Sequence, residues 1–193
     1  MKILKNILYA IVGLIVIMLL IGLFVSKDYA VERQVTIDKS KDVVFDYVKY
    51  LKNQNTYSVW IKADPNIKTN FTGTDATPGF ISAWESLDKN IGKGEQEITK
   101  IVDGERIDYE LRFMEPMKAT NLAYMTTESV TEGQTLVRWG FSGHMKYPMN
   151  LTLLFMNMDK MIGKDFEDGL LNLKTILESQ PAPMPADTLA KPE

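Results

Sequence analysis

The sequence predicts an α+β protein, in which one N-terminal transmembrane helix precedes a globular domain of about 150 residues built from an antiparallel sheet and a long C-terminal helix. Three observations lead to this fold class. Residues 7–25 are apolar and carry no charge. Residues 66–145 contain strand-like segments with no helical pattern between them. Residues 150–178 repeat apolar side chains at three- and four-residue steps.

The apolar segment from Ile7 to Val25 has the length of a membrane span. As a helix, its 19 residues extend about 28 Å, close to the hydrocarbon thickness of a bilayer. A cleaved signal peptide would have a shorter apolar core and small residues before the cleavage site, and a buried core helix would show a polar stripe. The segment has neither feature, so we expect an uncleaved anchor at residues 7–26 behind a short tail at residues 1–6.

The charges around the anchor predict its orientation. Lys2, Lys5 and the free amino group favour a cytoplasmic N-terminus. A bare count of the cations that follow the helix favours the opposite orientation, but most of them belong to the folded domain and lie among acidic residues. We therefore expect a single-pass membrane protein whose domain lies on the extracytoplasmic, periplasmic side.

The domain is expected to begin with a strand and two short helices. Residues 30–38 alternate apolar and polar side chains with the period of a half-buried strand. Ser40 can cap a helix that places its apolar residues, Val44, Tyr47, Val48 and Leu51, on one face. A polar stretch leads to a second short helix around Trp60, which ends at the turn Asp64-Pro65.

Six strands and one helix are expected to follow. The strands are predicted at residues 66–71, 79–87, 94–102, 106–114, 122–130 and 135–145, separated by turn-forming residues. Strict alternation in two of them predicts one buried and one wet face. The apolar stripe of residues 150–178 is expected to cover the buried face. Residues 179–193 hold four of the eight prolines and are expected to form a disordered tail, which leaves residues 30–178 as the domain.

Composition excludes several classes of function. Setting aside Lys2 and Lys5, the chain carries a net charge near −5, which opposes nucleic-acid binding. The absence of cysteine removes disulfides, thiolate nucleophiles and Cys-ligated zinc. His144 is the only histidine, and strand parity places it on the polar face of its strand. We therefore expect no catalytic residue, no metal site and no cofactor.

Several short motifs lie along the domain in a characteristic order. They are Val35-Thr36-Ile37 with Val43-Val44-Phe45, Trp60 with Asp64-Pro65, Gly79 to Trp84, Gly92-Lys93-Gly94, Glu105 to Phe113 with Pro116, Val137-Arg138-Trp139, and Met158 to Leu170. Together they resemble the START-related helix-grip superfamily (SRPBCC), in particular its polyketide-cyclase-like branch, over nearly all of residues 30–178. This resemblance implies a curved antiparallel sheet that grips the last helix around an apolar cavity. Members of this superfamily bind lipids, sterols, polyketides or other hydrophobic molecules, and some of them are enzymes.

Such a cavity would be lined by large apolar side chains of the strands and helices. The candidate ligand-binding residues are Trp60, Trp84, Tyr109, Phe113, Trp139, Phe141, Met158, Met161, Ile162 and Phe166. The alternative is that these side chains fill the core. Gly163 and Gly169, inside the last helix, leave open whether the helix packs closely on the sheet or leaves room for a ligand.

The leading interpretation is a membrane-tethered domain that binds a hydrophobic small molecule or a lipid, because the tether keeps it near the reservoir of such ligands. One alternative is a cyclase, dehydratase or hydrolase that acts on an apolar substrate. That reading needs an inward-facing acid or base, which strand parity does not supply, so the sequence favours a protein without catalytic activity. The other alternative is a ligand-free structural or interaction module of the cell envelope.

Overall fold

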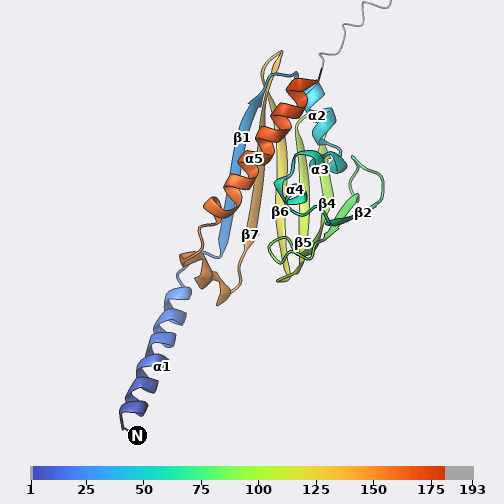
Figure 1. Ribbon diagram of the computed structural model, residues 1–193. Coiled ribbons are helices and arrows are strands. Elements are labelled where there is room, and N and C mark those ends of the chain that lie inside the picture. Colours follow the sequence, from blue (N-terminus) through green and yellow to red (C-terminus); the bar gives the residue numbers. More distant parts are fainter. Residues whose placement is uncertain (1, 181–193) are drawn as a thin grey trace, which may run out of the picture.

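In the computed structural model, which describes residues 2–180, a seven-stranded antiparallel sheet curves around one long helix (Figure 1). The strands are β1 (Asp28–Ile37), β2 (Lys68–Thr72), β3 (Ile81–Glu85), β4 (Lys93–Val102), β5 (Arg106–Glu115), β6 (Ala119–Thr131) and β7 (Gln134–His144). The helices are α1 (Lys2–Gly22), α2 (Lys41–Val48), η1 (Leu51–Asn53), α3 (Gln54–Tyr57), α4 (Val59–Ala63), η2 (Met149–Leu154) and α5 (Met158–Ser179). The predicted α+β helix-grip fold is therefore confirmed.

Strands β2 to β7 form a meander, and β1 adds a further strand at the β7 edge of the sheet. The strand order is β1-β7-β6-β5-β4-β3-β2, so β2 to β7 pair in chain order and β1 pairs with β7. In this pairing Asp28 lies opposite His144 and Ile37 opposite Thr135. The start of β1 and the end of β7 therefore lie at the same end of the sheet, and α1 leaves the domain there (Figure 1). We call this the α1 end of the domain.

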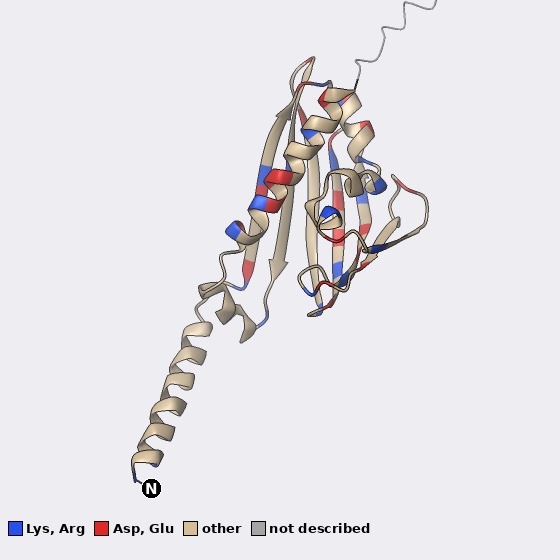
Figure 2. Cartoon of the chain, in the orientation of Figure 1, with Lys and Arg blue, Asp and Glu red and all other residues tan. Residues whose placement is uncertain are grey.

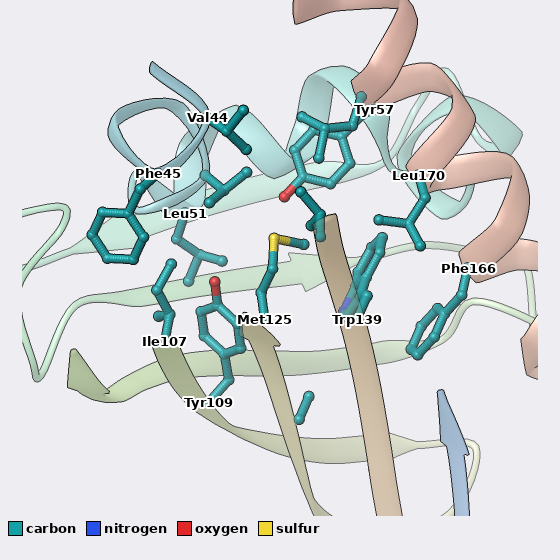
Figure 3. Close-up of a cluster of buried hydrophobic side chains, with 14 of the residues drawn as sticks. Val44, Phe45, Leu51, Tyr57, Ile107, Tyr109, Met125, Trp139, Phe166 and Leu170 are labelled. Atoms are coloured by element: carbon teal, nitrogen blue, oxygen red, sulfur yellow. The ribbon is translucent and has the colours of Figure 1, made fainter. Parts of the chain in front are cut away.

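The hydrophobic core fills the half of the concave face that is distant from α1. Helices α2 and α3 cover this half, and Val44, Leu51 and Tyr57 pack over Ile107 and Met125 of the sheet (Figure 3). Burial of the Tyr57 hydroxyl raises its pKa well above the ordinary value for tyrosine. Helix α5 completes the core with Leu170, Leu173 and Leu177, which recur at the helical repeat and are fully buried.

The C-terminal apolar stripe is divided into two elements, whereas the sequence predicts one helix from residue 150. Helix α5 begins only at Met158, because the side chain of Asn157 accepts a hydrogen bond from the backbone N–H of Lys160, 3.0 Å away, and caps it. The preceding residues form the short helix η2. A Cβ atom on Gly22 of α1 would lie 3.0 Å from the Leu151 side chain of η2, so these two helices touch.

Helix α1 is long and apolar enough to cross a membrane. It begins within the predicted N-terminal tail and ends at Gly22, four residues before the predicted end of the anchor. The buried side chain of Asn150 joins it to the domain, because Nδ2 donates to the carbonyl oxygens of Gly22 (2.7 Å) and Val25 (3.0 Å). At the other end of the chain, α5 ends at Ser179, and the rest of the predicted disordered tail beyond Gln180 lies outside the described residues.

Charged side chains lie almost entirely on the domain, and α1 carries them only near its N-terminus (Figure 2). On the outer face of the sheet, Arg112 forms ion pairs with three glutamates, Glu95 (2.6 Å), Glu97 (2.8 Å) and Glu110 (2.6 Å). These hydrogen bonds raise the pKa of the Arg112 guanidinium. The cluster faces away from α5, as strand parity predicts.

Candidate ligand pocket

A pocket of about 260 Å³ lies between the concave face of the sheet, α5 and the segment α3–α4. It occupies the half of the concave face nearer to α1, beside the core. Because side chains alternate along a strand, every second residue of β3 to β7 faces the concave side, and those nearer to α1 line this space. Its apolar lining consists of Trp60, Ile61, Trp84, Ile91, Leu111, Phe113, Ala123, Trp139, Phe141, Ile162 and Phe166.

Three aromatic side chains separate the pocket from the core. The rings of Trp139 on β7 and Phe166 on α5 stack with centroids 4.5 Å apart and planes at 7°. Trp60 of α4 meets both edge-on, at 6.2 Å from Trp139 and 5.8 Å from Phe166. Figure 3 shows Trp139 and Phe166 side by side at the edge of the core. This cluster forms a rigid, apolar inner wall.

The opposite wall is formed by Trp84 of β3 and Phe113 of β5, whose rings meet edge-on at 5.7 Å. Trp84 pairs with Gly94 in the sheet, and a Cβ atom at Gly94 would lie 2.6 Å from the indole. The glycine therefore lets the indole lie flat across β4. Its Nε1 donates to the carbonyl oxygen of Ile91 at 3.3 Å, so the polar end of Trp84 is paired and its ring face lines the pocket.

Polar side chains in the lining are all uncharged. They are Gln54, Asn55, Ser58, Thr69, Ser82, Asn90 and Gln96. Within residues 2–180, no Asp, Glu, His, Lys or Arg lines the pocket. Asp165 of α5 forms a hydrogen bond with Trp60 but does not line the pocket. Its pKa is raised, chiefly by burial and then by the charge of Asp168, while Lys164 and a hydrogen bond with Trp60 oppose the shift.

Gln96 is the polar lining residue with an unmet hydrogen-bonding group. The side chain is 8% exposed, and Nε2 has no hydrogen-bond partner among the described residues. Gln96 shares the inner face of β4 with Gly94 and Ile98, so strand parity could have placed it in the cavity. Gln96 is absent from the candidates drawn from the sequence because those are apolar or titratable side chains, and its amide is neither.

The structure places seven of the ten candidate residues in the pocket lining. These are Trp60, Trp84, Phe113, Trp139, Phe141, Ile162 and Phe166. Tyr109 is buried in the core instead, and burial raises the pKa of its hydroxyl. Met161 is 53% exposed, and Met158 lies in a separate groove beside Tyr29 and Leu154 near the end of α1. Ile162 and Phe166 are four residues apart on the face of α5 that meets the sheet, and Met161 lies about 100° around the helix from Ile162.

Close packing accounts for the two glycines of α5. A Cβ atom at Gly163 would overlap the guanidinium of Arg33 on β1. Arg33 is held in place by Asp159, whose Oδ1 lies 2.8 Å from Nη1 and whose Oδ2 lies 3.0 Å from Nη2. A Cβ atom at Gly169 would lie 3.0 Å from the Trp139 ring. Of the two readings of these glycines, the structure therefore supports a helix that lies close to the sheet.

His144 lies outside the pocket. Its Nδ1 is 2.7 Å from Oδ1 of Asp28, on the exposed side of the strand pair β1–β7. No group of three or more His, Asp or Glu side chains in the described part of the chain could hold a metal ion.

Residues 29–178 match the model of a protein family described as polyketide cyclase / dehydrase and lipid transport. This match agrees with the resemblance to the polyketide-cyclase-like branch of the helix-grip superfamily. No curated protein sequence matches the chain.

Solved structures share the fold of the domain. The chain is similar to norcoclaurine synthase from Thalictrum flavum in complex with dopamine and hydroxybenzaldehyde, with 9% identity, a TM-score of 0.60 and coverage of 83% of this chain and 93% of that chain. It is also similar to the Aha1 dimer from Colwellia psychrerythraea, with 15% identity, a TM-score of 0.54 and coverage of 78% of this chain and 97% of that chain. For Ara h 8.0201 the identity is 12%, the TM-score is 0.54, and the match covers 79% of this chain and 99% of that chain. At such identities the likeness extends to the fold alone.

Proposed function

The chain belongs to the polyketide cyclase, dehydrase and lipid transport family, and from this premise we propose that its pocket binds a hydrophobic small molecule or lipid while α1 anchors the domain to a membrane. The observation that carries the proposal is the pocket itself. Binding sites for small molecules are typically concave, mainly apolar and equipped with a few polar groups. The space beside Trp139 and Phe166 has this character, and its volume is slightly below the usual range of about 300–1,000 Å³. A small ligand, or one part of a longer one, fits it best.

The position of the pocket favours a ligand taken from the bilayer. Thr69, at the start of β2, and Asn90, in the β3–β4 turn, are its exposed lining residues. Because the sheet is antiparallel, the start of β2 and the β3–β4 turn lie at the same end of the strands as the start of β1, which is the α1 end of the domain. The opening and the proposed anchor are thus on the same side of the domain. A ligand dissolved in the membrane would have a short path to the pocket.

The uncharged lining favours binding over catalysis. A cyclase or dehydrase needs a positioned acid or base within hydrogen-bond reach of its substrate. Among the lining residues of the described chain, the polar groups are amides and hydroxyls, which bind and orient a ligand but do not transfer protons readily near neutral pH. Asp165 is hydrogen-bonded to Trp60 and does not line the pocket. We therefore propose a binding protein rather than an enzyme.

Native mass spectrometry of the full chain, extracted from membranes, tests this function. We expect a hydrophobic small molecule to copurify with the wild-type protein. A Leu111→Trp substitution would fill the pocket from β5 and remove the bound mass, whereas Leu122→Trp, on the exposed face of β6, would retain it. A wild-type protein that carries no ligand and binds no apolar fluorescent probe would contradict the proposal and favour a structural module.

A further inference from the structure

The amide of Gln96 lies in the middle of the pocket wall. Gln96 pairs with Ser82 of β3 and with Leu111 of β5, and all three residues line the pocket. Its side chain is nine-tenths buried, and its Nε2 is the one side-chain nitrogen or oxygen of the lining that is both buried and without a hydrogen-bond partner within residues 2–180. Buried amide groups in folded proteins are nearly always hydrogen-bonded, because an unmet donor loses its hydration without replacement.

A ligand of suitable chemistry would complete the hydrogen bonds of this amide. A glutamine side chain offers a donor and an acceptor, so it can pair with a carbonyl, an ester or a hydroxyl group. A carboxylate or phosphate in the same place would be buried without a cation, since the described lining holds no Lys or Arg. Ser82 is its polar neighbour on β3, whereas Trp84, Leu111, Phe113, Ala123 and Phe141 give the rest of the sheet wall an apolar surface.

We propose that Gln96 is the buried polar anchor of the pocket and that the ligand is an uncharged molecule that carries an oxygen-bearing group on an apolar body. This inference rests on the proposed binding function and specifies its ligand class. It assigns recognition of the oxygen-bearing group to Gln96 and binding of the apolar body to the aromatic walls.

Three probes of matched size test the proposal: butylbenzene, benzylacetone, which carries a ketone in the same skeleton, and hydrocinnamate, which carries a carboxylate. The full chain in lipid nanodiscs is titrated and its tryptophan emission recorded, because all three tryptophans of the chain line the pocket. After correction for partitioning into empty nanodiscs, we expect the wild type to bind benzylacetone roughly three- to tenfold more tightly than butylbenzene. Hydrocinnamate should bind most weakly.

The Gln96→Leu variant should lose the preference for the ketone while still binding butylbenzene. Gln34→Leu, on the outer face of β1, is the matched control and should keep the preference. Equal affinities of the wild type for ketone and hydrocarbon, or tightest binding of hydrocinnamate, would overturn the role of Gln96 and leave the binding function intact. If no probe binds, the binding function fails as well. If Gln96→Leu does not fold, the wild-type ratio alone decides.

A second inference comes from the exposed apolar side chains of the α1 end. Leu87 in the β3–β4 turn is 96% exposed, Met117 in the β5–β6 turn 61%, and Phe155 between η2 and α5 77%. Tyr147 and Leu154 are exposed beside them. Three connections at the opposite end, residues 38–40, 103–105 and 132–133, contain only polar residues, charged residues and glycine. The fourth, residues 73–80, adds Ala76, Pro78 and the buried Phe80, and Val130 is the exposed apolar side chain next to the last of these turns in the chain.

An array of exposed apolar side chains on separate loops at one end of a domain marks an interaction surface. This end is continuous with α1, because Asn150 and Leu151 hold the end of that helix against η2. Cationic side chains, Lys27, Lys89, Lys118 and Lys146, lie in the same connections. Apolar tips among lysines suit the interface of a bilayer, where acyl chains meet phosphate groups.

We infer that Leu87, Met117, Tyr147, Leu154 and Phe155 form a membrane-contact rim, which rests on the lipid interface beside α1. The rim would hold the pocket opening against the bilayer. This inference depends on the proposed membrane anchoring by α1 and is independent of the role of Gln96.

The cysteine-free sequence allows a direct test with single-cysteine variants of the full chain in nanodiscs. A nitrobenzoxadiazole label at Leu87→Cys or Met117→Cys should be quenched by phospholipids with spin-labelled headgroups. Phe24→Cys, next to α1, is the positive control, and Glu132→Cys, at the opposite end, should remain unquenched. Quenching at Phe24→Cys without quenching at Leu87→Cys and Met117→Cys would overturn the rim. Absence of quenching at Phe24→Cys would contradict membrane anchoring and, with it, the rim.

Discussion

Trp139 and Phe166 stack face to face, 4.5 Å apart, at the boundary between the core and the pocket. Trp139 belongs to the last strand and Phe166 to the last helix. Their aromatic contact therefore helps to join the sheet to α5. The pair separates two halves of the concave face. On one side α2 and α3 fill the space, and on the other side the space remains open.

This contact predicts a core-like cost for shortening Phe166. The ring is only 3% exposed, so Phe166→Ala should lower the free energy of unfolding by about 3–5 kcal/mol through lost burial and a new void. Leu171→Ala, on the exposed face of the same helix, should change it by less than about 0.5 kcal/mol. Denaturant unfolding in detergent measures both. Equal effects of the two substitutions would contradict the placement of Phe166.

Gly163 and Arg33 should be energetically coupled. An alanine at Gly163 gains about 1 kcal/mol of helix propensity, but its Cβ would displace the guanidinium of Arg33 from Asp159. We expect Gly163→Ala to be neutral or destabilising in the wild type and stabilising by about 1 kcal/mol in an Arg33→Ala background. A double-mutant cycle measures the coupling. The same effect in both backgrounds would mean that the two residues do not interact.

Asn150 should control how firmly α1 is attached to the domain. Asn150→Leu removes both donors to the carbonyl oxygens of Gly22 and Val25, which should loosen the connection between helix and domain. Limited trypsin digestion should then cut faster after Lys27, in this connection. An exposed substitution on β2, Asn70→Leu, is the control and should digest like the wild type. Unchanged cleavage in Asn150→Leu would show that other contacts suffice.

The tryptophan fluorescence of the folded protein should change with pH as Asp165, which is hydrogen-bonded to Trp60, is protonated. Because burial raises the pKa of this carboxyl in the folded domain, folding favours its neutral form. The stabilisation is complete at pH values below the unfolded pKa of about 3.9 and is lost as pH rises through the higher folded pKa. At pH 7 the Asp165→Asn variant should therefore be more stable than the wild type. It should also lack the acidic transition in tryptophan emission, which a pH titration of fluorescence records.

The orientation of α1 is tested with an export reporter. Lys2 and Lys5 precede the apolar segment, so we expect the N-terminus in the cytoplasm and the domain outside it. Alkaline phosphatase fused to the C-terminus, which is active only after export, should be active. An inactive fusion of normal abundance would reverse the orientation. Moving both lysines from the tail to positions after Val25 is the matched control and should lower the activity.

The sequence alone determined the sheet, the order of its strands along the chain and the faces of its side chains. The alternation of Ile107, Tyr109, Leu111 and Phe113 with charged residues is a local property of the chain, so it can be read without knowing any contact. The same is true of the apolar length of α1 and of the stripe of α5. Seven of the ten candidate residues taken from these patterns line the pocket.

Only the tertiary structure decided which part of the inner face is filled and which is open. Tyr109 and Phe113 share one face of β5, yet Tyr109 is buried under α2 and α3 whereas Phe113 lines the pocket. Similarly, Met161 is exposed because α5 turns Ile162, Phe166 and Leu170 toward the sheet, and Met161 lies about 100° around the helix from Ile162. The unpaired amide of Gln96 became significant only once the apolar walls around it were in place. These outcomes depend on packing between segments far apart in the sequence, which local periodicity does not encode.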